Sequence, residues 1–131
     1  MGLSTVALPT GWFYPRRRYF GVVAYDEALA ERVRDLISLR EGLSERKMFG
    51  GVGFMLGGNM ACGVHGDELI VRLPPEDGER ALAEPHARPF DLTGRPMKGW
   101  VFVAAEGLGS EEELASWVDA GADFAASLPA K

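Results

Sequence analysis

The glycine-rich run over residues 47–59, KMFGGVGFMLGGN, constrains the fold more than any other segment of the chain. Its apolar residues predict a strand from Met48 to Leu56, and Gly57-Gly58-Asn59 predicts the turn that ends it, because glycine and asparagine tolerate positive φ. A second strand is predicted to follow from Asn59, so the run forms the first hairpin of a sheet. Glycines 50, 51 and 53 are expected to let a neighbouring backbone or helix pack closely against the strand.

The surroundings of this run disfavour a phosphate-binding role. A P-loop needs lysine and Ser/Thr after its last glycine, and the dinucleotide fingerprint needs a third glycine where this chain has Leu56. Both motifs also lie between a strand and a following helix. Here the run follows a predicted helix and enters a hairpin, so its glycines are interpreted as structural.

The rest of the chain shows alternating helical and strand periodicity. The predicted helices cover residues 26–40, 76–83 and a segment starting at the Ser110–Glu113 capping box, and the predicted strands cover 48–56, 59–64, 68–73, 90–92 and 99–104. Strand 99–104 is apolar on both faces, so we expect it to be central and covered on two sides. The residues of the last helix expected to face inward are Leu114, Trp117, Val118, Phe124 and Leu128. This order predicts an α+β fold, with an antiparallel sheet of about five strands and the N- and C-terminal helices packed on it.

Composition divides the chain into a leader, residues 1–23, and one domain, residues 24–131. The leader mixes proline, glycine and aromatic residues without a period, and we expect it to be either disordered or a mis-assigned translation start. It contains three arginines and no acidic residue, so with a net charge of −5 the remainder carries −8. Strong stand-alone DNA binding is disfavoured by that acidity.

Two further features of composition bear on location. No apolar stretch is long enough to span a bilayer, so no membrane association is expected. A single cysteine, Cys62, excludes an intramolecular disulfide and favours a reducing, cytoplasmic location.

No pattern of catalytic, cofactor-binding or metal-binding residues is recognised. Cys62 and His65 have the spacing of a zinc half-site, but there is no second pair, and an offset of three on a strand places them on opposite faces. Nothing in the sequence brings Cys62 and His86 together as a nucleophile and base. The remaining candidates are basic side chains that form a patch for a phosphate or an acidic partner, or are solvated charges at strand ends. These candidate partner-binding residues are Arg46, Lys47, Arg72, Arg95 and Lys98.

Several segments, taken in order, resemble the N-terminal domain of the TfoX/Sxy family. The most specific is Arg46-Lys47-Met48-Phe49-Gly50-Gly51-Val52-Gly53-Phe54. The supporting segments are the helix opening Tyr25-Asp26-Glu27, the strand Leu69-Ile70-Val71-Arg72-Leu73, the turn Gly94-Arg95-Pro96-Met97-Lys98, and the closing helix from Leu114 to Ala122. The resemblance covers about residues 24–128. Family members include regulators of natural competence that act with the cAMP receptor protein at promoters and carry a second, C-terminal helical domain, for which this chain has no room.

The resemblance implies a non-enzymatic regulatory or interaction module without a cofactor, acting through protein contacts, with the transcription machinery as the expected partner. Two alternatives stay open: direct DNA binding through the basic residues, and small-ligand or enzymatic function in a pocket beside the glycine-rich strand. A homodimer also stays open.

Overall fold

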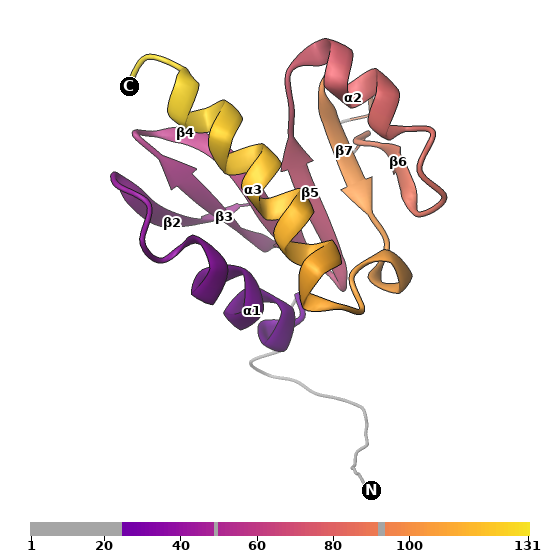
Figure 1. The fold of residues 1–131 in the computed structure, drawn as a ribbon, viewed down its shortest axis with the longest axis horizontal. Coiled ribbons are helices and arrows are strands. Elements are labelled where there is room, and N and C mark those ends of the chain that lie inside the picture. The colour runs from indigo at the N-terminus through magenta and orange to yellow at the C-terminus, as the bar shows by residue number, and fades with distance from the viewer. Residues whose placement is uncertain (1–24, 49, 92–93) are drawn as a thin grey trace, which may run out of the picture.

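Two layers make up the fold, one of helices and one a six-stranded sheet (Figure 1). The computed structural model describes residues 25–48, 50–91 and 94–131. The sheet order is β2-β3-β4-β5-β7-β6, and all neighbouring strands pair antiparallel. The predicted α+β class with an antiparallel sheet is therefore confirmed, whereas the predicted leader lies outside the described residues.

The helices are α1 Glu27–Ile37, α2 Pro75–Ala81 and α3 Glu111–Ser127, with a short 3-10 turn, η1, at Ala105–Gly107. The strands are β2 Leu43–Met48, β3 Gly51–Leu56, β4 Asn59–His65, β5 Glu68–Arg72, β6 Ala87–Pro89 and β7 Trp100–Val103. None of the helices in the described part of the chain is both long and apolar enough to cross a membrane.

The glycine-rich run contributes to two hairpins, which corrects the prediction of one continuous strand from Met48 to Leu56. Strand β2 ends at Met48, and Gly50, with φ at 77°, lies at the reversal into β3. The register pairs Met48 with Gly51. Sequence reading missed β2 because its middle residues are polar and exposed at the sheet edge, so they show no apolar alternation.

Strand β6 also differs from prediction, since it ends at Pro89 where the predicted strand was to begin at Phe90. Proline cannot donate a ladder hydrogen bond, and β6 is the other edge of the sheet, where this is tolerated.

Strand β7 lies between β5 and β6, next to the edge strand β6, and its two faces are covered as predicted. Val101 and Val103 join the helix-side core, and Phe102 faces the other way.

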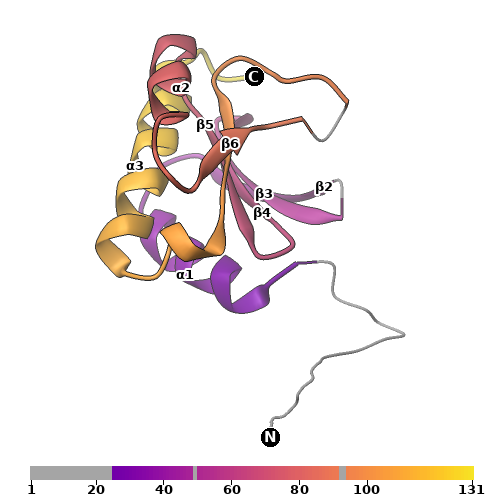
Figure 2. The ribbon, with the colours of Figure 1, turned by 90° about the vertical axis from the view of Figure 1, so that its right-hand side faces the viewer.

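All three helices lie on one face of the sheet (Figure 2). Leu29, Val33 and Ile37 of α1 and Leu114 and Val118 of α3 are buried there against alternate strand residues. The remaining buried positions of α3 are small: Gly121, Ala122 and Ala125.

Three of the five residues expected to face inward from the last helix, Trp117, Phe124 and the C-cap residue Leu128, are only partly buried, although Trp117 packs against the helix-side core. The reason is the close approach of α3 to β4: a Cβ built at Gly121 would lie 2.3 Å from the carbonyl oxygen of Ala61. Small residues fill this contact, and the bulky side chains lie beside it.

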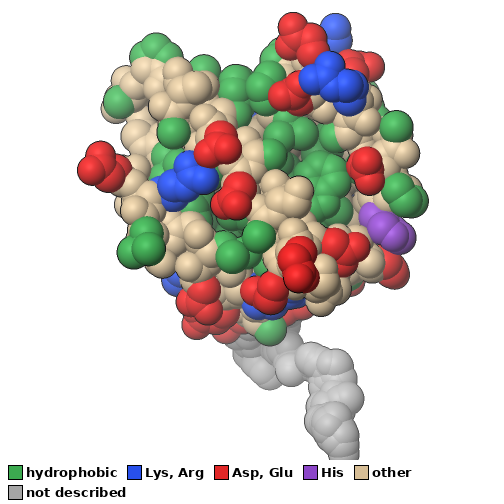
Figure 3. Space-filling model, in the orientation of Figure 1, with side chains coloured by type: hydrophobic (Ala, Val, Ile, Leu, Met, Phe, Trp, Pro, Cys, Tyr) green, Lys and Arg blue, Asp and Glu red, His purple; other side chains and the backbone are tan. Residues whose placement is uncertain are grey.

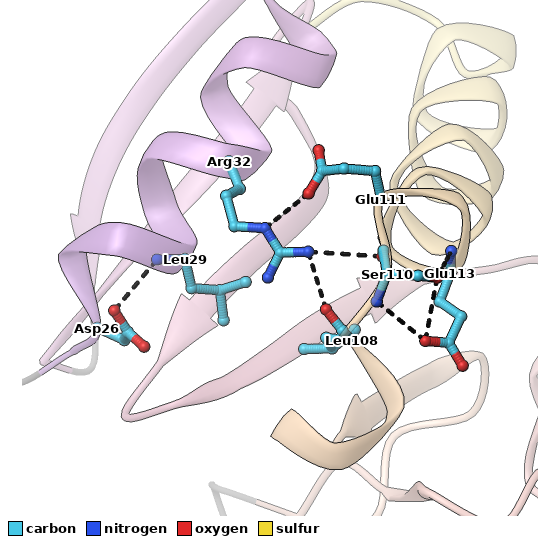
Figure 4. A network of polar contacts seen from close by, with 7 residues as sticks. All are labelled: Asp26, Leu29, Arg32, Leu108, Ser110, Glu111 and Glu113. Atoms are coloured by element: carbon cyan, nitrogen blue, oxygen red, sulfur yellow. Dashed lines mark hydrogen bonds and ion pairs between the residues drawn. The ribbon is translucent and has the colours of Figure 1, made fainter.

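Polar contacts join the start of α1 to the start of α3 (Figure 4). Asp26 caps α1 by accepting from the Leu29 N–H at 3.1 Å. Arg32 donates to Glu111 at 2.8 Å and to the Leu108 carbonyl at 2.9 Å. The predicted capping box is confirmed, because Ser110 and Glu113 bond each other's backbone N–H groups.

The edge strand β2 is attached to α1 by a bidentate ion pair. Arg34 donates through Nε and Nη2 to the two carboxylate oxygens of Glu45, at 2.5 and 2.9 Å. These hydrogen bonds lower the pKa of the Glu45 carboxyl. The pair also fixes Glu45 on the helix side of the sheet, so Arg46 and Met48 point to the opposite side.

We predict that Gly121→Ala destabilises the protein by about 1–3 kcal/mol, because the added methyl collides with the β4 backbone. In an unobstructed helix the same change would stabilise by about 1 kcal/mol. Urea unfolding followed by circular dichroism measures the difference. Gly109→Ala is the matched control, since a Cβ there meets nothing within 4 Å. An unfolding free energy for Gly121→Ala at or above that of the unsubstituted protein would contradict the close contact.

Candidate binding site on the open face of the sheet

The face of the sheet opposite the helices, here called the open face, has an apolar pocket of about 360 Å³. Its lining combines sheet residues, the chain between β6 and β7, and the C-terminal segment. The residues that border it are Met48, Val52, Met55, Gly58, Met60, Val64, His65, Ile70, Arg72, Phe90, Met97, Trp100 and Lys131. We call this the open-face pocket.

Two glycines, paired in the register of β3 and β4, form the floor of this region. Gly53 lies opposite Gly63, and neither carries a side chain to fill the space above the sheet. Methionines occupy it instead: a Cβ at Gly53 would lie 3.4 Å from Met48 side-chain atoms, and one at Gly63 would lie 2.7 Å from Met60 Cε. Gly51 allows the backbones of β3 and β4 to lie close together, because a Cβ there would lie 2.2 Å from the Val64 carbonyl oxygen. The predicted close backbone approach is therefore confirmed at Gly51.

Every methionine in the described part of the chain lines the pocket: Met48, Met55, Met60 and Met97. Methionine has a flexible, polarisable side chain that adapts to irregular apolar partners. Met55 and Met60 are buried, whereas Met97 is 38% exposed at the rim. The pocket therefore has an adaptable apolar wall on the β3–β4 side.

Aromatic rings make the opposite wall. Phe90 lies 5.0 Å from Phe102 and 5.6 Å from Trp100, between ring centroids. His65 adds a tilted contact with Phe102 at 6.1 Å. These separations fall in the range of favourable aromatic pairs, so this wall is a packed cluster.

The charged side chains at the pocket are basic. The Arg72 guanidinium lies over two rings, 5.3 Å from the centroid of Trp100 and 5.5 Å from that of Phe124. Lys131 borders the pocket from the C-terminal segment, where its backbone N–H donates to the Gly57 carbonyl at 2.8 Å. The buried Asn59 holds the same segment by donating to the Pro129 carbonyl at 2.9 Å. Among the described lining residues there is no aspartate or glutamate.

The five basic residues predicted as partner-binding do not form one cluster. Arg72 lines the pocket, and Arg46 shares the open side of β2 with Met48. Arg95 and Lys98 are exposed in the segment that carries Met97. Lys47 differs, because its ammonium lies 5.2 Å from the ring of Tyr25 and its pKa is raised by a hydrogen bond with that residue. Their role in partner binding stays a prediction.

Sequence reasoning kept open a pocket beside the glycine-rich strand, but of the candidate residues only Arg72 lines the pocket that the structure shows. The doubly apolar strand at residues 99–104 predicted two covered faces, which pointed to apolar neighbours on the side away from the helices. The methionines had no such signal, since positions 48, 55, 60 and 97 share no period. The sheet register brings Met48, Met55 and Met60 together, and the chain between β6 and β7 adds Met97, whose backbone N–H donates to the Phe90 carbonyl at 3.1 Å.

The thiol and imidazole groups lie apart. Cys62 belongs to the helix-side core and His65 to the open face, so the predicted placement on opposite faces is confirmed. His86 packs against Gly107 of η1, and both residues line a hollow beside α2 and α3. Burial raises the pKa of the Cys62 thiol to about 12, which disfavours the nucleophilic thiolate. Within residues 25–48, 50–91 and 94–131, no group of three His, Cys, Asp or Glu side chains could hold a metal ion.

The hollow beside α2 and α3 has a volume of about 690 Å³ and is lined by residues such as Glu84, His86 and Trp117. Two of its charged groups already have partners in the structure, and Glu84 and Glu112 add acidic charge to it. Arg80 pairs with Asp77, and Glu113 completes the capping box of α3. In the open-face pocket, by contrast, the Arg72 guanidinium lies beside apolar walls and no side-chain carboxylate lines the pocket among the described residues, so this pocket is the stronger candidate site.

Comparison with known proteins gives one match. A family model described as the TfoX N-terminal domain matches residues 35–125. No curated protein and no solved structure matches the chain.

We predict that Cys62 does not react with a thiol reagent such as dithionitrobenzoate in the folded protein at pH 8. Its raised pKa leaves almost no thiolate at that pH, and its side chain is buried. Absorbance after reagent addition measures the reaction, and the same protein in 6 M guanidinium provides the fully reactive control. Equal rates in the two conditions would contradict the placement of Cys62 in the helix-side core.

Proposed function

Because the chain belongs to the TfoX N-terminal domain family, we propose that it is a non-enzymatic regulatory module that binds a partner protein through the open face of its sheet. The observation that carries the proposal is the methionine-lined apolar face, which none of the helices in the described part of the chain covers. The family resemblance points to regulation at promoters, so the expected partner is a component of the transcription machinery.

The composition of the open face suits a protein contact. Met97 is exposed at its rim, and the buried methionines beneath can adjust to a partner side chain. Aromatic residues and arginine are also enriched in interfaces, and Trp100 and Arg72 lie together here. The edge strand β2 borders the same face with Arg46 and Met48.

Basic side chains occur on both sides of the molecule, but those that line the open-face pocket have no side-chain carboxylate among the described lining residues. Acidic side chains are distributed over the helix-covered face (Figure 3), and α3 contains acidic residues but no basic one. Arg72, Arg95 and Lys98 belong to the open side or its rim. This distribution favours a partner with apolar and acidic groups, because opposite charges steer association.

Direct DNA binding has weaker support. The basic residues of the open side surround an apolar pocket and do not follow a continuous groove. The acidic domain as a whole repels a phosphate backbone, so few favourable phosphate contacts are available.

We predict that Met97→Glu reduces recovery of the partner at least tenfold in an affinity pull-down from a lysate of the encoding organism. A carboxylate at the rim would place an unpaired charge in an apolar contact, at a cost of about 1.4 kcal/mol or more. Quantitative mass spectrometry compares the proteins recovered with each bait.

Leu39→Glu is the matched control, since Leu39 is 96% exposed and follows α1, on the helix side. It should recover the same partner as the unsubstituted protein. Circular dichroism establishes that both variants are folded. A partner recovered equally with Met97→Glu and with Leu39→Glu would contradict binding through the open face.

A further inference from the structure

We infer that the open-face pocket binds a small amphipathic carboxylic acid, with its apolar chain against the methionine side chains that cover Gly53 and Gly63 and its carboxylate at Arg72. The inference goes beyond the proposed function, because it concerns a ligand within the pocket and needs no partner protein. It also gives the open face a means of responding to a metabolite.

The pocket has the size and composition of a ligand site. Its volume of about 360 Å³ lies within the range of small-molecule pockets. With about 30 Å³ per molecule in liquid water, it corresponds to about a dozen waters. A linear acid of about ten non-hydrogen atoms fits that space, whereas a folded partner element does not.

The walls favour a flexible aliphatic chain. The floor lacks side chains at Gly53 and Gly63, and the atoms nearest to their missing Cβ positions include the side-chain ends of Met48 and Met60. Such ends can rotate away, because methionine has several freely rotating bonds. Ile70 and the Phe90 ring complete an apolar surface on the β5 side. An alkyl chain entering here would replace water against apolar groups, which is favourable.

Arg72 determines the polar end of the ligand. Five other arginines of the domain have a carboxylate partner: Arg32, Arg34, Arg40, Arg80 and Arg88 each form an ion pair. Arg46 and Arg95 have none among the described residues, but neither of them lines the pocket. No such pair involves Arg72 within the part of the chain that the structure describes. Its guanidinium is instead held in position by the rings of Trp100 and Phe124.

A guanidinium positioned in this way can accept a carboxylate through two parallel hydrogen bonds. A neutral amide offers Arg72 one carbonyl acceptor and no charge, whereas a carboxylate offers two oxygens and a charge-assisted, stronger pair of hydrogen bonds. A cationic ligand would be repelled by Arg72 and by the nearby Lys131. The charge of the pocket therefore selects an acid.

Octanoate and octanamide form a matched pair of probes, since they share an alkyl chain and differ in charge. We expect octanoate to bind the full chain at least tenfold more tightly than octanamide, both below the concentration at which octanoate forms micelles. The protein is labelled with ¹³C at its methionine methyl groups, and the titration is followed by NMR. The signals of Met48, Met55, Met60 and Met97 should shift, because these residues line the pocket. Amide signals of α1 should stay in place.

Three variants test separately the carboxylate contact at Arg72 and the apolar contact of the alkyl chain. Arg72→Gln should remove the preference for octanoate over octanamide, while Arg95→Gln, which removes an exposed charge near the rim, should keep it. Gly53→Val should weaken both probes, because its side chain occupies the floor. Unfolding curves establish that each variant is folded. If Gly53→Val is unfolded, Met60→Phe, which adds bulk beside the same floor, replaces it.

Three results would overturn the inference: no methionine shift with octanoate, equal affinity for the two probes, or an unchanged preference in Arg72→Gln. Tighter binding of a peptide that ends in a leucine carboxylate would also overturn it, in favour of a protein segment as the occupant. The titration uses the purified chain alone. Its failure therefore leaves the pull-down with Met97→Glu unaffected, and failure of the pull-down leaves the titration unaffected.

Discussion

The placement of all three helices on one face of the sheet is the constraint on which the rest of the structure depends. It follows from the close contact of α3 with β4, where Gly121 lies against the Ala61 carbonyl and no larger residue fits. A sheet covered on one side exposes the other, and an exposed face is normally polar. Here that face is apolar, so its own side chains and the chain between β6 and β7 must exclude water from it.

Glycine is used in this domain for three different purposes. Gly50 lies at the reversal of the chain with a positive φ, where other residues would be strained. Gly51 lets β3 and β4 approach, and Gly53 leaves space above the sheet that methionine side chains enter. The motif that identifies the family therefore also shapes the pocket.

Ion pairs occur on both faces of the sheet, since Arg88 pairs with Glu68 beside Phe102 on the open side. Arginines on the helix side, such as Arg32 and Arg34, join α1 to neighbouring elements through carboxylates. Surface pairs of this kind contribute little stability each, but they fix the positions of the helices. On the open side, Arg72 lies against aromatic rings and next to an apolar pocket. The same residue type thus supports structure through ion pairs and, at Arg72, remains available for binding.

The sequence by itself determined the class of fold, the capping box at Ser110, the opposite faces of Cys62 and His65, and the family. These depend on local periodicity and short motifs, which neighbouring residues along the chain specify. Tertiary structure decided the edge strand β2, the small residues of α3 and the gathering of four methionines with Arg72. Those features depend on which strands pair and how closely a helix approaches them. No local pattern encodes such contacts, because the residues that make them lie far apart in the chain.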